Sequence, residues 1–261
     1  MRLQELFLVE TTEEDRALIS LSTVVYSYLK KYAGKRLKDG EIVDVGTIGQ
    51  LFDTPINILD PVRIQLWSHN DILKQFPRQA SSADIEDPEL EDEDDRNILG
   101  FWDPKEELVA LNVDYLESHG LKGAVTHELR HALDDYKSDF RAGASTRYDT
   151  PRKKEHRKDL SNDPYASDLE KKKPYHAKPA EINARFAEVL HGVTAQIQHI
   201  LKRSPENVRP RVMAVFKKLL DMKHIAHLFP EKEQSRDYKR LVKRGMDFIE
   251  KELAYAQSQQ K

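Results

Sequence analysis

The segment His127-Glu-Leu-Arg-His131 constrains the fold and the chemistry of this chain more than any other part of its sequence. On an α-helix, residues four positions apart lie on one face, one turn apart, so the two imidazoles can bind a single metal ion. Glu128 then lies beside that ion without being a ligand. This arrangement is typical of a hydrolytic zinc site, in which the glutamate takes a proton from a zinc-bound water whose pKa has fallen towards about 7. We expect Zn²⁺ held by His127 and His131, with Glu128 as the catalytic base.

The residues around this segment favour a helix. Val125 and Thr126 precede the segment, Ala132 and Leu133 follow it, and the apolar positions predict an amphipathic helix over about 123–136. The alternative is a charged helix with two ordinary surface histidines, because the five-residue motif also occurs by chance.

Zinc needs a third protein ligand, and three parts of the chain offer one. Asp134 and Asp135 follow His131 by three and four residues. On a continuous helix they lie about 4.5–6 Å further along the axis, too far to reach a metal that His127 also binds. We expect these two carboxylates to accept a hydrogen bond from the second ring nitrogen of a ligand histidine instead.

The helix predicted over 179–202 is the second source of a ligand. Glu181 lies in its first turn, after a long loop that can bring the helix alongside, and Glu188 lies two turns further on the same face. His176, just before the helix, is the third source. We expect Glu181 to be the ligand, with Glu188 and His176 as alternatives. A negative charge in the first turn of a helix is also explained by the helix dipole alone.

Two further residues, Tyr175 and Arg185, are candidates for lesser roles in the site. Tyr175 and Arg185 are placed in sequence where either side chain can stabilise an oxyanion. Arg185 has a second interpretation, an ion pair with Glu181 or Glu188 on its own helix. We expect His191 to lie on the surface of that helix.

The apolar periodicity predicts helices around a small sheet. Helices are expected over about 12–33, 123–136, 179–202, 206–228 and 234–257, with a strand at 62–67 and a hairpin over 98–112. We expect an α+β fold in which a small mixed sheet packs on the helix that carries His127. The chain is predicted to form a single domain, 1–261, with its core at about 55–202 and a C-terminal helical extension over about 203–258.

Two segments are not expected to form regular structure. Residues 84–95 hold nine acidic side chains in twelve positions, a density of like charge that predicts a surface loop or disorder. Residues 140–178 are polar and predict a long irregular insertion, and loops of that length are usually functional or disordered.

Composition excludes several classes of protein. The chain of 261 residues has no cysteine, which excludes disulfides, thiol nucleophiles and cysteine-ligated clusters. Its formal charge of −3 provides no basic field for nucleic acid. No apolar run reaches the length of about 18 residues that indicates a membrane span, and the N-terminus is a poor secretory signal. We expect a cytoplasmic protein that acts on a peptide or protein substrate, without a membrane or nucleic-acid partner.

The residues described above resemble the gluzincin metallopeptidases, which have a HExxH helix and a glutamate on a downstream helix. The likeness is to small ImmA/IrrE-type zincins and to zincins encoded by phages. It is carried by ELVALN, HELRHALDD and EINARFAEVL, and covers about 98–200, with Arg130 where those zincins usually carry glycine. The resemblance implies a zincin-like fold with Zn²⁺ bound by His127, His131 and Glu181. It also implies a substrate strand along the sheet edge, and a phage-encoded or virion-associated protein as an alternative setting.

Two other functions are weighed against zinc proteolysis. The sequence contains Glu-x-x-His at 128–131 and again at 188–191, and two such motifs with two further glutamates form the di-iron site of ferritin-like bundles. Glu14 and Glu181 supply the extra carboxylates in that alternative. The other alternative is a catalytically inactive, zincin-like binding module.

Overall fold

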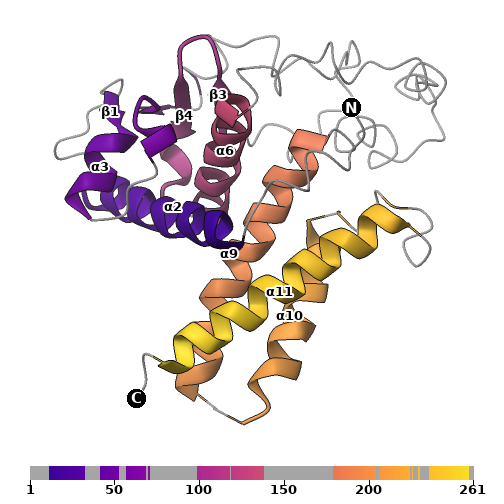
Figure 1. Cartoon of the computed structure of the whole chain (residues 1–261). Helices are drawn as coiled ribbons and strands as arrows, with labels where there is room; N and C mark the ends of the chain where they lie inside the picture. The colour runs from indigo at the N-terminus through magenta and orange to yellow at the C-terminus, as the bar shows by residue number, and fades with distance from the viewer. Residues whose placement is uncertain are drawn as a thin grey trace, which may run out of the picture.

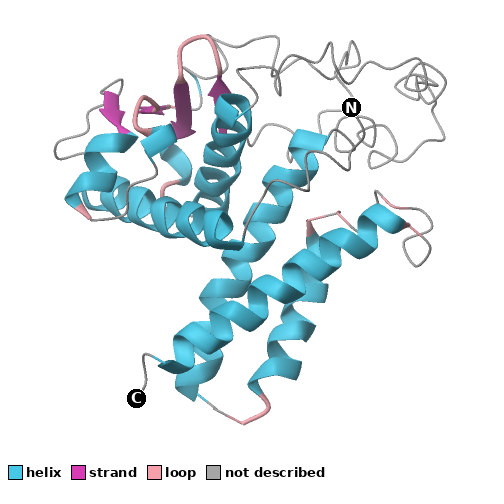
Figure 2. Ribbon diagram, viewed as in Figure 1, coloured by secondary structure: helices cyan, strands magenta, loops and turns pink. Residues whose placement is uncertain are grey.

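One four-stranded sheet and six α-helices make up the described part of the computed structural model (Figure 1, Figure 2). The structure describes residues 12–32, 42–52, 57–68, 70, 99–117, 119–137, 179–203, 206–223, 225, 229 and 235–258. The predicted α+β class is confirmed.

The sheet is mixed, as predicted. Its strands are β1 (Ile42–Asp44), β2 (Arg63–Trp67), β3 (Gly100–Asp103) and β4 (Leu108–Asn112), in the order β1-β2-β4-β3. β2 and β4 are parallel, whereas β1 pairs with β2, and β3 with β4, in antiparallel fashion. The predicted strand at 62–67 and the predicted hairpin are both confirmed, and β3 forms one edge of the sheet.

The side chain of Asp103 stabilises the turn between β3 and β4. Asp103 Oδ1 accepts hydrogen bonds from the backbone N–H groups of Lys105, at 2.9 Å, and Glu106, at 3.4 Å. An aspartate that bonds the backbone two residues on is a common way to start a turn. All five residues of β4 are buried, because this strand lies between β2 and β3.

Helix α6 (His119–Lys137) carries the HExxH segment and is the central element of the fold. It contacts β3 and β4 on one side and helices α2 (Thr12–Tyr32) and α9 (Pro179–Arg203) on others. α6 begins at His119, four residues before the predicted start at 123. The reason is that Leu121 lies one turn before Val125 and extends the same buried face.

Two hydrophobic cores lie on the two sides of α9. The sheet core includes Leu18, Leu21 and Val25 of α2, Ile64 and Leu66 of β2, Val109 and Leu111 of β4, and Val125 and Leu129 of α6. The helical core joins α9 to α10 (Val208–Met222) and α11 (Arg236–Ser258), and includes Ile182, Phe186, Val193, Val212, Phe216, Leu241 and Phe248. Figure 1 shows α9 running from the sheet side of the molecule down between these two groups of elements.

The C-terminal helices differ in one boundary from the prediction. α11 matches the predicted 234–257 closely, but α10 ends at Met222 and not near 228. The chain leaves the helix at Lys223, and the side chain of Ile225 then packs into the helical core with no exposed surface. The burial of Ile225 therefore ends the helix earlier than the apolar pattern suggests.

Several short elements were not predicted. These are β1, α3 (Val45–Leu51) and two 3₁₀ turns, η1 (Asn57–Leu59) and η4 (Val113–Tyr115). The acidic segment 84–95 and the insertion 140–178 lie outside the described residues, so the expectation that they form no regular structure stays a prediction. Among the described helices, none has a stretch long and apolar enough to cross a bilayer.

Candidate metal centre

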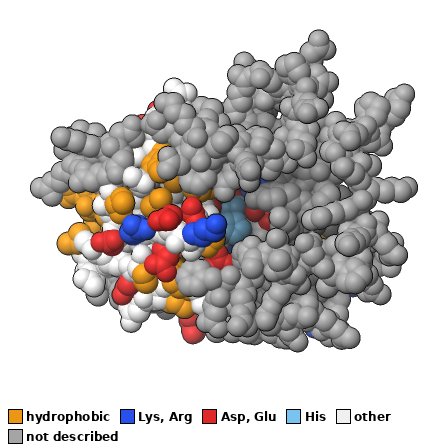
Figure 3. Space-filling view, turned by 90° about the horizontal axis from the view of Figure 1, so that it is seen from above, with side chains coloured by type: hydrophobic (Ala, Val, Ile, Leu, Met, Phe, Trp, Pro, Cys, Tyr) orange, Lys and Arg blue, Asp and Glu red, His pale blue; other side chains and the backbone are white. Residues whose placement is uncertain are grey.

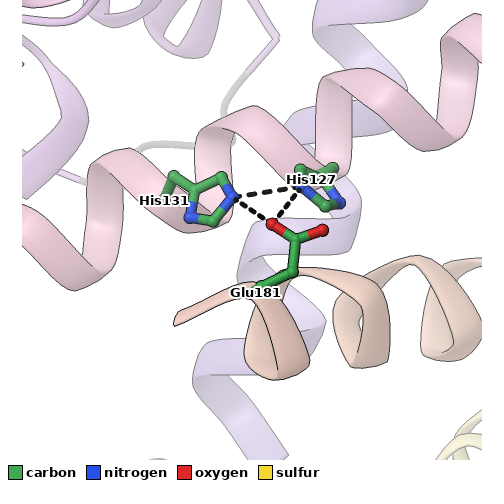
Figure 4. A group of neighbouring side chains, drawn as sticks. All are labelled: His127, His131 and Glu181. Carbon is green, nitrogen blue, oxygen red and sulfur yellow. Dashed lines mark hydrogen bonds and ion pairs between the residues drawn. The ribbon is translucent and has the colours of Figure 1, made fainter. Parts of the chain in front are cut away.

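Three side chains from two helices converge at the junction of α6 and α9 (Figure 4). His131 Nε2 lies 3.0 Å from His127 Nε2. Glu181 Oε2 lies 3.6 Å from His127 Nε2 and 3.5 Å from His131 Nε2. Figure 4 shows both imidazoles turned towards the same carboxylate oxygen.

These distances suit a single zinc ion. Ligand atoms placed tetrahedrally at 2.0–2.2 Å from zinc lie about 3.3–3.6 Å from one another. The three measured separations of 3.0, 3.5 and 3.6 Å fall close to that range. Two histidines and one glutamate are also a common donor set of catalytic zinc sites. The residues therefore form a group able to hold a metal ion.

Local structure explains why these three residues meet. His127 and His131 stand four positions apart on α6, so both project from one face of it. Glu181 lies in the first turn of α9, which begins at Pro179 and packs along α6. The two histidine side chains keep 14% and 20% of their surface exposed, whereas Glu181 keeps 4%. Figure 3 shows histidine atoms at the surface, beside acidic and basic side chains.

Glu188 contacts His127 at the ring nitrogen that faces away from the other two side chains. His127 Nδ1 lies 2.6 Å from Glu188 Oε1, which directs the other ring nitrogen, Nε2, towards His131 and Glu181. Burial alone lowers the pKa of His127, but its hydrogen bonds to Glu181 and Glu188 outweigh burial and raise the pKa well above 6.5. Burial raises the pKa of Glu188, but the hydrogen bonds and charges of His127 and Lys223 together outweigh burial and lower the pKa to about 2. Such a carboxylate partner is a common way to fix the orientation of a ligand histidine.

The expected partners of the histidines, Asp134 and Asp135, are placed elsewhere. Asp134 pairs with Arg130 at 2.8 Å and accepts a hydrogen bond from Asn183 at 3.3 Å. Asp135 accepts a hydrogen bond from the indole of Trp102 at 2.7 Å. Both aspartates lie on buried faces of α6. The hydrogen-bond partner of His127 Nδ1, which the sequence predicted to be an aspartate, is Glu188.

Arg185 pairs with Glu181, as one of its two interpretations predicted. Arg185 Nε donates a hydrogen bond of 2.8 Å to Glu181 Oε1, the carboxylate oxygen that faces away from the imidazoles. Burial raises the pKa of Glu181, but hydrogen bonds with His127 and His131 outweigh burial, and the pKa falls below its usual range. Glu181 is therefore ionised, and one of its oxygens remains directed at the two histidines.

Glu128 is buried next to the three converging side chains. Its exposed fraction is 8%, and burial raises its pKa above the usual value. Strand β3 comes close to it, because a Cβ added at Gly100 would lie 3.5 Å from Glu128 Cγ and 2.9 Å from the carbonyl oxygen of Ala110. A glycine at the start of β3 therefore allows the edge strand to approach both β4 and the glutamate.

The prediction of an exposed His191 is wrong. The side chain is buried, and its ring nitrogens contact the hydroxyl groups of Thr126, at 2.5 Å, and Thr23, at 3.2 Å. Burial lowers the pKa of His191 to about 4, so this imidazole is neutral at pH 7. Helices α2 and α6 cover this face of α9, which the periodicity of α9 alone does not reveal.

The di-iron alternative gains no support from these contacts. Both nitrogens of His191 are engaged by threonines, and Glu188 is engaged by His127. Glu14, the other proposed ligand, pairs with Lys137 at the far end of α6. In the part of the chain that the structure describes, these residues do not form a second metal-binding group.

Two predicted candidates, Tyr175 and His176, lie outside the described residues. The sequence did not predict the structural role of Arg130. This residue lies between the two histidines, is fully buried and contacts Asp15 and Asp134.

Comparison with known proteins finds no matching family model, no similar curated protein and no similar solved structure. The zincin resemblance therefore depends on the residues of the site and not on a match along the chain.

Proposed function

We propose that this protein is a zinc-dependent metallopeptidase. The observation that carries the proposal is the convergence of His127, His131 and Glu181, with separations that suit one tetrahedral zinc ion. The adjacent Glu128 supports hydrolysis over a purely structural role for the metal, since a structural site needs no neighbouring base. A zinc ion in such a site lowers the pKa of a water molecule and polarises a substrate carbonyl.

The side chains of the site have separate tasks in this proposal. His127, His131 and Glu181 hold the ion, and Glu188 and Arg185 orient two of these ligands from outside. A carboxylate oxygen of Glu128 accepts the proton of the attacking water and delivers it to the leaving amine. Burial raises the pKa of Glu128, and a carboxylate with a raised pKa is a stronger proton acceptor than a free glutamate.

The edge of the sheet supports a peptide as the substrate. β3 is an edge strand, and Gly100 at its start lies beside Glu128. An extended peptide that pairs with β3 would run past the base, and main-chain hydrogen bonds would hold it irrespective of sequence. We expect the natural substrate to be a protein with an accessible extended segment.

The proposal is tested by comparing wild type, Glu128→Gln and Glu181→Ala on an unstructured protein substrate, with zinc measured in each. Wild type is expected to hold about one zinc per chain and to cleave. Glu128→Gln should keep the zinc and lose a factor of roughly 10²–10⁴ in rate, because an amide is nearly isosteric but is not a base. Glu181→Ala should lose zinc, whereas Asp135→Ala is the matched control and should retain it.

Three outcomes would contradict the proposal. Cleavage that Glu128→Gln retains within about threefold would exclude this base. Two irons per chain would favour the di-iron alternative. Zinc binding without cleavage of any substrate tried would favour the inactive binding module.

A further inference from the structure

Glu188 has a partner on each of its carboxylate oxygens. Oε1 is 2.6 Å from His127 Nδ1, and Oε2 contacts the ammonium group of Lys223. The Glu188 side chain is only 9% exposed, whereas that of Lys223 is 39% exposed. A carboxylate this deeply buried is costly without charged partners, and Lys223 provides one from the solvent side.

The backbone of Lys223 is connected to Glu181, the proposed third ligand, through Arg185. The Lys223 carbonyl oxygen accepts a hydrogen bond of 3.5 Å from Arg185 Nη1, and Arg185 Nε donates to Glu181 Oε1 at 2.8 Å. Glu181 is thereby left with Oε2 facing the two imidazoles. Two chains of contacts therefore start at Lys223, one ending at His127 and the other at Glu181.

Lys223 itself is held in a defined place. It caps the C-terminal end of α10, where its N–H bonds to the carbonyl of Leu219 at 2.9 Å. Two residues later, Ile225 bonds to the carbonyl of Leu220 at 3.0 Å, and its side chain is fully buried in the helical core. Packing in the helical core therefore fixes the position of Lys223, which contacts Glu188 and Arg185.

We propose that Lys223 is a positioning residue of the metal centre, whose ammonium group keeps Glu188 out of the ligand set. This inference rests on the proposed metal site. It explains why, of two carboxylates on the same face of α9, Glu181 lies near Nε2 of both histidines whereas Glu188 contacts His127 through Nδ1. It also makes the C-terminal extension part of the site, although none of its described residues belongs to the group formed by His127, His131 and Glu181.

The alternative is a surface ion pair with no effect on the metal. A half-exposed lysine–glutamate pair is commonly worth little, and its loss would then leave the site unchanged. The two explanations differ in one respect: only a positioning role links Lys223 to the identity and number of the metal ligands. The test therefore has to measure the metal site itself and not stability alone.

The experiment uses full-length Lys223→Met, which removes the charge and keeps the length of the side chain. Zinc affinity is measured by competition with a chromophoric chelator, and the visible absorption of the Co²⁺-loaded protein reports the number and type of ligands. We expect Lys223→Met to bind zinc about 10- to 100-fold more weakly than wild type and to change the cobalt spectrum. Lys223→Arg should restore both, because a guanidinium can also bind Glu188.

Lys218→Met is the matched control, since Lys218 is exposed on the same helix. It should leave zinc affinity and the cobalt spectrum as in wild type, and circular dichroism should show that all variants fold. An affinity within about threefold of wild type and an unchanged cobalt spectrum in Lys223→Met would overturn the inference, as would wild-type protein that binds neither metal. Peptidase activity does not enter this test, so a protein that binds zinc but cleaves nothing contradicts the proposed function and leaves this inference standing.

Discussion

At the scale of single residues, the proposed metal site requires a metal ion to displace a proton from His127. The histidine lies between Glu188 on Nδ1 and Glu181 near Nε2, and these carboxylates raise its pKa well above 6.5. Because the pKa is raised in the folded state, protonated His127 stabilises the metal-free protein below about pH 6.5, and this contribution is lost as the pH rises through the folded pKa. A metal ligand must be unprotonated, so zinc binding has to expel that proton.

We therefore predict that zinc binding at pH 7 releases at least one proton from the protein. Each released proton makes zinc affinity rise about tenfold per pH unit until the pH passes the pKa of His127 in the metal-free fold. The measurement is titration calorimetry in two buffers with different ionisation enthalpies, repeated at several pH values. Equal heats in the two buffers at pH 7 would show that His127 is already neutral, contrary to this prediction.

At the scale of elements, the contact between α10 and α11 depends on a residue without a side chain. Gly245 lies on α11 against the ring of Phe216 on α10. A Cβ at Gly245 would lie 2.2 Å from Phe216 Cζ, and Phe216 is fully buried and pairs edge-on with Phe186 at 6.4 Å. The ring is enclosed in the helical core, so the absence of a side chain at Gly245 allows the close approach of the two helices.

We predict that Gly245→Ala lowers the free energy of unfolding by about 1–3 kcal/mol, although alanine is the better helix former by about 1 kcal/mol. Urea unfolding measures this change. In a Phe216→Leu background the smaller side chain leaves space, so the same substitution should cost less than in wild type. An equal cost in both backgrounds would show that the contact with Phe216 is not the cause.

At the scale of the whole molecule, one aspartate links helices from three parts of the chain. Asp15 of α2 is buried and lies 3.4 Å from Arg130 Nη1 of α6 and 3.0 Å from Arg244 Nε of α11. Arg130 is itself between the two histidines of the metal centre. The network joins the elements of the sheet core to the C-terminal extension, so we expect the two cores to unfold together.

We predict that Asp15→Ala lowers the free energy of unfolding by about 3–5 kcal/mol, because two guanidinium groups lose the buried carboxylate between them. Glu250→Ala is the control, since it breaks the exposed pair with Arg209 and should cost less than about 1 kcal/mol. Urea unfolding followed by circular dichroism measures both changes. Similar costs for the two variants, or two separate transitions in wild type, would contradict the proposed link.

Much of the secondary structure was predictable because it repeats along the chain. The apolar positions of α2 and α9 recur at helical spacing and are buried. β1 could not be predicted, because three residues show no periodicity, and α3 contains two glycines among seven residues. The zincin-like fold and the single-domain organisation stay predictions.

The sequence by itself determined that two imidazoles share one face of a helix, since the spacing of His127 and His131 and the helix period suffice for that. It also narrowed the third ligand to a few carboxylates and a histidine. Only the tertiary structure decided among them, because the choice depends on which polar groups distant helices bring alongside. Arg185 leaves one oxygen of Glu181 for the site, whereas His127 and Lys223 occupy both oxygens of Glu188. Hydrogen-bond partners, and not position on the helix alone, leave an oxygen of Glu181 directed at both histidines and make Glu188 a support for His127.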